Sequence, residues 1–291
     1  MLRIAPLGNG NVNATWRVET RAADGRQRSL VLQRLNTRVF PRPELVMANI
    51  QRLGEHLDQG AAAAIPGRWE LPRVIPRRAG GNPWLEQGGA VWRMLSFIED
   101  ARTVETISSR DQALQVGRAL GCFHTLIHDL PAAELADTLE GFHVTPRYLT
   151  QFERVLRHSR VPFSPQAQHC LAFIRDREAF VPVLERARQA GWLTPRPIHG
   201  DPKLNNILFD AHSGAAIALI DLDTVKPGLI HYDIGDCLRS GCNRLGEETD
   251  ALDQVAFDLE LCEALLEGYG AVASGFLSPA DHRYLYDAIR L

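Results

Sequence analysis

Four polar residues in one stretch of the sequence have the types and the spacing for chemistry at a bound metal. In the run HGDPKLNN, Asp201 follows His199 by two positions and Asn206 follows Asp201 by five. The apolar run AIALI then leads directly to Asp221. Carboxylate and amide oxygens are the ligands that Mg²⁺ prefers, and a further carboxylate can orient an attacking hydroxyl group and accept its proton. Phosphoryl transfer needs these functions and little other covalent chemistry from a protein.

The spacing of these residues suggests a role for each of them. His-x-Asp-x-x-x-x-Asn is the pattern of the kinase catalytic loop, and an aspartate that closes a later strand is what the kinase metal site requires. We therefore predict that Asp201 is the catalytic base and that Asn206 and Asp221 hold Mg²⁺. Lys203 is expected to offset charge on the transferred phosphoryl group, although an exposed lysine there would need no function. Asp223 has two interpretations, a second metal ligand or an exposed carboxylate in a loop.

Histidines in two places are interpreted as structural. His199 is expected to hold the loop that carries Asp201 rather than to act as a catalyst. His124 and His128 lie at positions i and i+4 of one predicted helix, which is the spacing of a zinc-hydrolase motif. That motif needs a glutamate where this chain has Thr125, so we favour helix packing over a metal site. Phe142 and the residue after it, in the run GFHVTPRY, either line an acceptor pocket or pack at a helix start.

A turn near the start of the chain contains two glycines, in the run GNGNVNA. It lies between two predicted strands, where an Asn-Gly pair is also a common hairpin signal. A strand-turn-strand cannot be the dinucleotide-binding loop, which must open a helix so that the helix N-terminus meets pyrophosphate. The sequence also contains no GxxxxGK[ST] motif. A Walker-type site is therefore excluded as the basis of nucleotide binding.

The length and the pattern of the sequence predict two packed units of the α+β class. The chain has 291 residues, 45% of them hydrophobic, which corresponds to about two units. Residues 1–98 are expected to form a small sheet with one main helix, and residues 99–291 a mostly helical unit. The segment 194–224 is an exception with short strands and loops. Predicted strands include WELPRVIP and AVWRMLSFI, and predicted helices include HCLAFIRDREAFVPVLERARQAG and TDALDQVAFDLELCEALLEGYG.

The composition limits the partners that we expect. A net charge of -3 offers no overall attraction to nucleic acid or to a membrane surface. No apolar run reaches the roughly 18 residues of a membrane span, and the start lacks the features of a signal peptide, so we expect a cytoplasmic protein. The five cysteines are scattered without a C-x-x-C pair, so we expect neither a disulfide framework nor a zinc ribbon. We expect a monomer or a homodimer with a small-molecule substrate.

Five runs of residues, spread over nearly the whole chain, carry a resemblance to a known family. They are GNGNVNATW, LVLQRLNTRVFP, GFHVTPRY, HGDPKLNNILFD and IDLDTVKPGLIHYDIGD. Together these runs resemble the kinase-like small-molecule phosphotransferases, the superfamily of aminoglycoside phosphotransferases and choline kinases. Within it, they are most similar to the N-acetylhexosamine 1-kinases. The resemblance implies a bilobal protein-kinase-like fold with ATP and Mg²⁺ bound between an N-lobe and a helical C-lobe. It also implies transfer of the γ-phosphate of ATP to the anomeric hydroxyl of an N-acetylhexosamine or a related sugar.

The resemblance further implies which residues contact the nucleotide and hold the loop. Residues 8–13 would cover the phosphates, the segment near Phe97 would be the hinge that meets adenine, and Asp233 would be a structural carboxylate. Gln33 stands where general kinases have a phosphate-binding lysine. The candidate nucleotide-binding residues are therefore Gly8, Asn9, Gly10, Asn11, Asn13, Gln33, Phe97 and Ile98.

Three features leave alternatives open. The related kinases have an acidic residue and a histidine where this chain has Asn9 and Asn11, so the sugar preference is open. They also continue past Leu291, which leaves open whether part of the acceptor pocket is missing or rebuilt. Because Gln33 replaces a lysine, a nucleotide-binding protein without transfer activity is one alternative. The other is a kinase of a different small alcohol, such as an aminoglycoside, an amino alcohol or another sugar.

Overall fold

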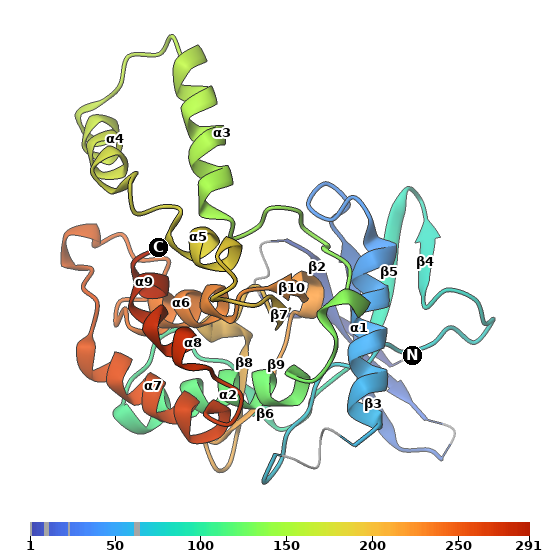
Figure 1. The fold of residues 1–291 in the computed structure, drawn as a ribbon. Helices are drawn as coiled ribbons and strands as arrows, with labels where there is room; N and C mark the ends of the chain where they lie inside the picture. Colours follow the sequence, from blue (N-terminus) through green and yellow to red (C-terminus); the bar gives the residue numbers. More distant parts are fainter. Residues whose placement is uncertain (1, 9–11, 23, 61–64) are drawn as a thin grey trace.

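The computed structural model describes residues 2–8, 12–22, 24–60 and 65–291 (Figure 1). A sheet with one long helix forms the N-terminal part, and helices dominate the rest of the chain (Figure 1). The prediction of an α+β protein with an antiparallel N-terminal sheet and a mostly helical C-terminal part is therefore confirmed.

The N-terminal part is built on a five-stranded antiparallel sheet in the order β1-β2-β3-β5-β4. Its strands are β1 (Arg3–Pro6), β2 (Ala14–Arg21), β3 (Gln27–Leu35), β4 (Trp84–Gln87) and β5 (Ala90–Ser96). Along β5, buried and half-buried side chains alternate, as expected for a strand with one face in the core. Val91, Arg93 and Leu95 are the buried members, so this face includes one arginine among apolar side chains.

Helix α1 (Pro43–Asp58) joins the sheet to the helical part. Pro43 stands in its first turn, where the missing N–H group costs nothing. The buried side chain of Asn49 donates hydrogen bonds to the carbonyl oxygens of Ala136 and Val225, both at 2.8 Å. These bonds fix α1, and with it the sheet, against the loops of the helical part.

One segment of the N-terminal part differs from the prediction. The run WELPRVIP at 69–76 was expected to be a strand, but it makes only isolated bridges, from Glu70 to Ala218 and from Val74 to Leu95. Pro72 and the proline at the end of the run lack the N–H groups that a hydrogen-bonded ladder needs. The fourth strand, β4, comes later in the chain instead.

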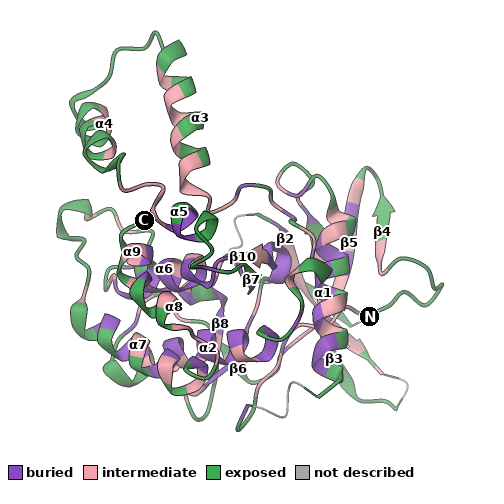
Figure 2. Ribbon diagram, viewed as in Figure 1, coloured by how far each residue is buried: buried purple, intermediate pink, exposed green. Residues whose placement is uncertain are grey.

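The helical part is organised around the contact of α2 (Arg110–Ile127) with α7 (Leu259–Ala273). A Cβ atom on Gly117 would lie 1.8 Å from the carbonyl oxygen of Leu265, so only glycine permits this approach. Helix α6 (Ile230–Gly241) packs beside them, and its buried residues continue the core (Figure 2). The other helices are α3 (Thr145–His158), α4 (Pro165–Arg177), α5 (Val183–Gln189), α8 (Pro279–Arg283) and α9 (Leu285–Arg290).

Two predicted helices are shorter than expected. The run from His169 to Gly191 is divided into α4 and α5, and Pro182 stands directly before α5, where a continuous helix would have lost a backbone hydrogen bond. The run from Thr249 is helical only from Leu259, because residues before it form turns and a short 3₁₀ segment at Leu252–Gln254. Asp258 caps α7 by accepting a hydrogen bond from the Leu261 N–H group, which marks the start of the helix.

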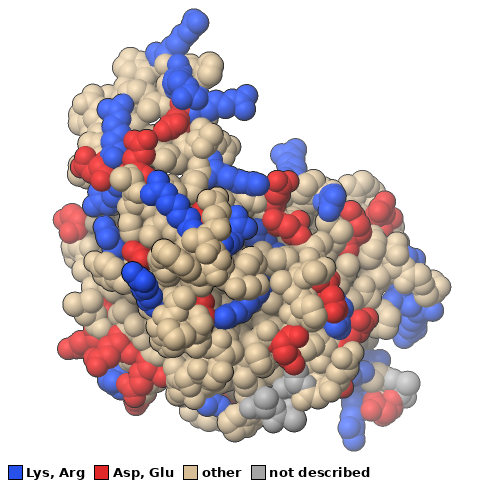
Figure 3. Space-filling view, in the orientation of Figure 1, with Lys and Arg blue, Asp and Glu red and all other residues tan. Residues whose placement is uncertain are grey.

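Helices α3 and α4 project from the body of the molecule and contain no buried residue (Figures 1 and 2). Figure 3 shows basic side chains along this projection and a group of acidic side chains in the region of α7. Among the described residues, no helix has both the length and the apolar character needed to span a bilayer.

Two small sheets position the polar loops. β7 (Arg196–Ile198) pairs with β10 (Lys226–Gly228), and β8 (Ile207–Asp210) lies between β6 (Ala101–Arg102) and β9 (Ala216–Leu219). The loop 199–206 therefore runs from β7 to β8, and the loop 220–225 runs from β9 to β10. This pairing brings the two predicted polar loops side by side.

Candidate active site

Asp233 on α6 holds the start of the loop that carries Asp201. This fully buried carboxylate accepts hydrogen bonds from the N–H groups of His199 at 2.7 Å and Gly200 at 2.8 Å. It also accepts one from His124 Nε2 at 2.9 Å. Burial alone would raise the pKa of Asp233, but the bonds from His124 and Gly200 hold it below its ordinary value. Asp233 is therefore a structural anchor of the loop.

Of the histidine pair His124 and His128, His124 binds the Asp233 carboxylate. His124 Nδ1 lies 2.9 Å from the hydroxyl of Tyr269, so both of its ring nitrogens have protein partners. His128 is exposed and its Nδ1 lies 2.8 Å from the carbonyl oxygen of Thr125. Within the described ranges, no group of three or more His, Cys, Asp or Glu side chains is arranged to hold a metal ion. The contacts of this histidine pair are those of helix packing.

His199 connects the two polar loops. Its Nδ1 accepts a hydrogen bond from the Asp201 N–H group at 3.2 Å, and its Nε2 lies 2.9 Å from the carbonyl oxygen of Ile220. Because that carbonyl can only accept, Nε2 carries the proton and the ring is neutral. Burial lowers the pKa of His199, which favours the same neutral form. The ring thus fixes Asp201 relative to the residue that precedes Asp221.

Asp201, Lys203 and Asn206 lie together in the loop, as their spacing predicts. Lys203 Nζ lies 3.2 Å from Asp201 Oδ2. Asn206 Nδ2 donates to the Asp201 carbonyl oxygen at 2.8 Å and to its Oδ2 at 3.3 Å. Burial raises the pKa of Asp201, and the nearby Asp201 carboxylate raises the pKa of Lys203 although burial opposes that shift. About a quarter of each of these two side chains is exposed, so a ligand can reach them.

Asp221 follows β9 and takes a left-handed backbone conformation, with φ 64° and ψ 60°. A non-glycine residue in this region is strained, and such strain is typically found at functional sites. Loss of solvent around the carboxylate, together with the charges of Asp223 and Asp201, raises the pKa of Asp221 to about 7. The negative charges of these neighbouring carboxylates repel one another, and a bound cation would relieve this repulsion.

Asp223 is buried rather than exposed in a loop. Its side chain is 2% exposed, and its Oδ1 forms an ion pair with Arg93 Nη2 at 2.5 Å. Its Oδ2 accepts a hydrogen bond from Asn13 Nδ2 at 2.7 Å. Both carboxylate oxygens are thus engaged by residues of the N-terminal part. This contact excludes the exposed alternative for Asp223 and connects the sheet to the loop that carries Asp221.

Two of the predicted nucleotide-binding residues take part in the same network. Gln33 Oε1 accepts from Arg93 at 2.9 and 2.7 Å, and its Nε2 donates to Thr15 Oγ1 at 3.1 Å. Asn13 accepts a hydrogen bond from the Asn36 N–H group at 2.9 Å in addition to its bond to Asp223. The side-chain amides of Gln33 and Asn13 therefore orient Arg93 and Asp223.

Arg93 is a site residue that was not predicted. A signal for it exists in the sequence, because Val91, Arg93 and Leu95 share one face of a strand whose other members on that face are apolar. An arginine on a buried face requires a carboxylate partner, which the sequence pattern does not identify.

The remaining predicted residues that the structure describes are Gly8, after β1, and Phe97 and Ile98, after β5. Gly8 has φ 67°, and Asn9, Gly10 and Asn11 lie outside the described residues. The Phe97 ring lies 4.5 Å from the guanidinium of Arg17, and Ile98 is buried against the helical part. Phe97 and Ile98 lie between β5 and the first residues of the helical part, and their contact with adenine stays a prediction.

His143, which sequence reasoning did not assign to the site, contacts the loop from the side of α3. Its Nε2 lies 2.6 Å from the carbonyl oxygen of Gly200, and its ring stacks on Tyr232 with 5.6 Å between the centroids. Its backbone has φ 67°, another strained non-glycine conformation. The Gly200–Asp201 peptide is therefore held by Asp233 on its N-terminal side and by His143 at its carbonyl.

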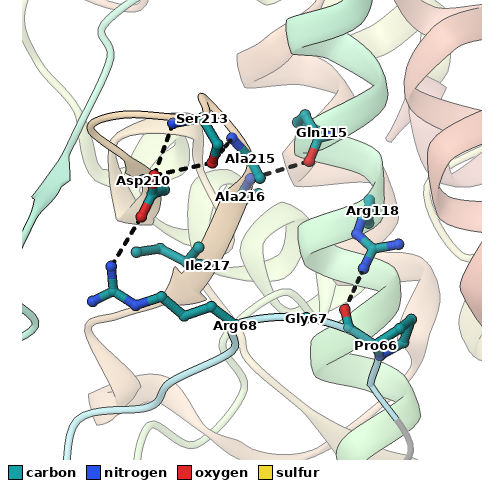
Figure 4. A pocket seen from close by; sticks show the side chains of 10 residues that line it. All are labelled: Pro66, Gly67, Arg68, Gln115, Arg118, Asp210, Ser213, Ala215, Ala216 and Ile217. Atoms are coloured by element: carbon teal, nitrogen blue, oxygen red, sulfur yellow. Dashed lines mark hydrogen bonds and ion pairs between the residues drawn. The ribbon is translucent and has the colours of Figure 1, made fainter.

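A cavity of about 370 Å³ lies away from these residues, between residues 66–68, α2 and the β8–β9 turn (Figure 4). Arg68 points to Asp210 at 3.0 Å, and Arg118 donates to the carbonyl oxygen of Pro66 at 2.9 Å. Gln115 accepts a hydrogen bond from the Ala216 N–H group at 3.1 Å. The polar groups that line this cavity have protein partners, and none of the predicted site residues that the structure describes lies there.

The sequence of this chain matches a protein family. Residues 3–273 match the model described as the phosphotransferase enzyme family. The chain belongs to this family. The prediction of a kinase-like phosphotransferase is therefore confirmed at the level of the family. Members of this family transfer a phosphoryl group, which is the chemistry that Asp201 and its neighbours suggest.

Solved structures show the same fold. An aminoglycoside phosphotransferase from Alicyclobacillus acidocaldarius matches with a TM-score of 0.62 and 16% identity, over 100% of this chain and 80% of that one. A Plasmodium vivax ethanolamine kinase matches with a TM-score of 0.56 and 14% identity, over 99% and 72%. An amicoumacin kinase, in complex with AMP-PNP and Ca²⁺, matches with a TM-score of 0.55 and 14% identity, over 98% and 77%. The predicted kinase-like fold is thereby confirmed.

Proposed function

We propose that this phosphotransferase moves the γ-phosphate of ATP onto a hydroxyl group of a sugar, namely the anomeric hydroxyl of an N-acetylhexosamine or a related sugar. The observation that carries the transfer chemistry is the arrangement of Asp201 with Lys203 and Asn206 in a loop that His199 ties to the Asp221 loop. The choice of a sugar rests on the five sequence runs that resemble the N-acetylhexosamine 1-kinases. The nucleotide is supported by the amicoumacin kinase, whose structure contains AMP-PNP.

The residues present fit a divalent cation, for which we propose Mg²⁺. Asn206 uses its Nδ2 for Asp201, which leaves its Oδ1 for a cation, and Asp221 supplies a carboxylate whose pKa is raised to about 7 beside other carboxylates. This set consists of oxygen donors, which hard cations prefer. When bound, Mg²⁺ would offset charge on the nucleotide phosphates. We assign it to Asn206 and Asp221, whereas Asp223 would support the site through Arg93.

Asp201 would act as the base through its Oδ1 atom. Oδ2 faces both Lys203 and Asn206, and no hydrogen bond from the described part of the chain engages Oδ1. The acceptor hydroxyl would donate to Oδ1 and pass its proton there as its oxygen bonds to the γ-phosphorus and ADP leaves. Lys203 would offset the negative charge that develops on the transferred group. The raised pKa of Asp201 favours acceptance of this proton.

The experiment is a ³¹P NMR spectrum of the protein with MgATP and N-acetylglucosamine or N-acetylgalactosamine. A new signal with the shift and splitting of an anomeric sugar phosphate is the expected result. Asp201→Asn serves as the matched control, because it keeps the size of the side chain and removes the base. Formation of ADP and inorganic phosphate alone, with no sugar phosphate, would contradict the proposal.

A second candidate is a kinase of another small alcohol. The ethanolamine kinase and the amicoumacin kinase share this fold, so the fold is compatible with acceptors that are not simple sugars. The same spectrum recorded with ethanolamine, choline and an aminoglycoside tests this candidate. An ordinary phosphomonoester signal with one of these, and none with sugars, would favour it.

A further inference from the structure

The segment 136–143, which leads into α3, contacts both polar loops of the site. Thr138 Oγ1 donates a hydrogen bond to the carbonyl oxygen of Asp223 at 3.1 Å, in the loop between β9 and β10. At the other end of the segment, His143 Nε2 lies 2.6 Å from the carbonyl oxygen of Gly200, in the loop between β7 and β8. A single stretch of chain outside these loops therefore connects them.

Further bonds fix this segment to the body of the protein. Lys226, whose side chain is 3% exposed, donates from Nζ to Asp137 Oδ1 and to the carbonyl oxygen of Leu139, both at 3.0 Å. The Ala136 N–H group donates to Asn49 Oδ1 at 2.9 Å. The imidazole ring at the end of the segment is thus carried by a stretch of backbone that is itself held in place.

The contact of His143 fixes the peptide group that precedes Asp201. The Gly200 carbonyl can only accept, so His143 Nε2 carries the proton and donates it. The N–H group of the same peptide belongs to Asp201 and donates to His199 Nδ1 at 3.2 Å. Because a peptide group is planar, these two bonds together set its rotation. Gly200 has no side chain to restrict that rotation, so the direction in which the Asp201 carboxylate points depends on them.

His143 is held against this carbonyl from several sides, in a strained conformation. Its φ of 67° is rare for a residue other than glycine. Its N–H group donates to Tyr148 Oη at 2.7 Å, and its ring stacks on Tyr232 with 5.6 Å between centroids and 19° between planes. The Tyr232 hydroxyl in turn donates to the buried carboxylate of Glu185 on α5. Strain that is maintained by so many contacts is typical of functional sites.

We propose that His143 is a positioning residue for phosphoryl transfer, whose Nε2–H group holds the Gly200–Asp201 peptide so that the Asp201 carboxylate faces the acceptor hydroxyl. The inference rests on the proposed function, namely on Asp201 as the base, and it applies whichever alcohol is the acceptor. A base must lie within hydrogen-bond reach of the hydroxyl in the transition state. Loss of the His143 donor therefore acts on the transfer step and not on nucleotide binding.

Three variants and a matched control separate the hydrogen bond from packing. His143→Phe keeps an aromatic ring against Tyr232 and removes the donor, and His143→Gln keeps an N–H donor on a side chain of similar length. If His143→Phe does not fold, His143→Asn replaces it, because asparagine tolerates the left-handed conformation and is shorter than histidine. The control is His128→Phe, since His128 also stacks on an aromatic ring, that of Phe276 at 5.4 Å and 18°, and its Nδ1 lies 2.8 Å from the Thr125 carbonyl oxygen. Thermal unfolding verifies that each variant is folded.

Steady-state kinetics with an alcohol that the wild type phosphorylates give the first readout. We expect His143→Phe to lower kcat about 10- to 100-fold, because a displacement of about 1 Å at a reacting group costs up to about 10²-fold. The KM for ATP should stay within about twofold. His143→Gln should recover kcat to within about threefold of the wild type, because it restores the donor. His128→Phe should stay within about twofold of the wild type.

Amide hydrogen exchange of the loop between β7 and β8, followed by mass spectrometry, gives a second readout that needs no acceptor. Rotation of the Gly200–Asp201 peptide would weaken the bond from the Asp201 N–H group to His199. We therefore expect the loop to exchange faster in His143→Phe than in the wild type. The loop should exchange at the wild-type rate in His128→Phe and close to it in His143→Gln.

Several results would overturn the proposal. One is an unchanged kcat or an unchanged loop exchange in folded His143→Phe. Another is a kcat of His143→Gln as low as that of His143→Phe, since the shape of the ring and not its N–H group would then matter. A rise of the KM for ATP as large as the fall of kcat would show a general disturbance of the loop.

Failure of the proposed function gives a different pattern. If Asp201→Asn keeps the wild-type kcat, the role of Asp201 as the base fails. If Asp201→Asn is inactive and His143→Phe is fully active, only the role of His143 fails. If the wild type phosphorylates none of the alcohols, the proposed function fails, and the exchange of the loop still decides whether His143 holds the Gly200–Asp201 peptide.

Discussion

The buried ion pair between Arg93 and Asp223 gives a quantitative test of how the sheet is joined to the catalytic loops. The two side chains are 1% and 2% exposed. Arg93→Met keeps a long apolar stem and removes the charge, which leaves the Asp223 carboxylate buried without its main partner. Loss of one partner of such a pair costs about 3 to 5 kcal/mol, because a charge without compensation stays out of water. We expect the free energy of unfolding to fall by that amount.

Urea unfolding followed by circular dichroism measures this change, and an exposed ion pair in the same chain provides the control. Arg110 and Glu267 form a pair at 2.5 Å in which the side chains are 53% and 56% exposed. Arg110→Met should cost less than about 1 kcal/mol, since solvent screens an exposed pair. A further variant, Arg93→Met with Asp223→Asn, should be more stable than Arg93→Met alone, because it also removes the buried charge.

The reasoning would be refuted if Arg93→Met lowered the free energy of unfolding no more than Arg110→Met does. It would also be refuted if the double variant were less stable than the single one, since the loss would then come from packing and not from the unpaired carboxylate. The same variants allow a functional readout. If the pair sets the position of the Asp221 loop, the folded fraction of Arg93→Met should bind MgATP more weakly than Arg110→Met in calorimetry.

Three further predictions concern the loop itself. Asp201→Asn should lower kcat about 10²- to 10⁴-fold and leave the affinity for MgATP unchanged in calorimetry; a parallel loss of affinity would contradict a role as base. Gly200→Ala should lower both the unfolding midpoint and kcat, because Gly200 has φ +87° and the new Cβ atom would lie 2.6 Å from the Thr224 carbonyl oxygen; a wild-type midpoint would show that the loop adapts. Because the pKa of Asp221 is raised to about 7, a cation must displace its proton below that pH. The Mg²⁺-dependent part of nucleotide affinity should therefore fall about tenfold from pH 8 to pH 6, and an unchanged affinity would place the cation elsewhere.

Local patterns in the sequence were sufficient for the fold class and for the grouping of the loop residues. Asp201, Lys203 and Asn206 lie within six positions of one another, so a single loop conformation brings them together. The strand that precedes Asp221, β9, was visible as a short apolar run for the same reason. The helical spacing of α1 and the alternation along β5 are likewise local, because each depends on the geometry of one element.

Element boundaries depended on interactions that the local pattern does not contain. The run at 69–76 has the side chains of a strand, but its prolines leave it with isolated bridges. The run from Thr249 has apolar residues at helical spacing, yet the helix begins only where Asp258 caps it. Hydrogen bonds decide where a helix is capped and which strands pair. The spacing of apolar residues does not predict these hydrogen bonds.

The contacts that orient the site were decided by the tertiary structure. Asn13 and Asp223 are 210 positions apart in the chain, and His124 and Asp233 are 109 apart. Taken alone, each of these side chains could be exposed to solvent or buried. Once it is buried it needs a hydrogen-bond or ion-pair partner, because an unpaired polar group away from water is costly. The sequence by itself therefore determined which groups can do the chemistry. Folding decided that Arg93, His143 and Asp233 hold the loops that carry them.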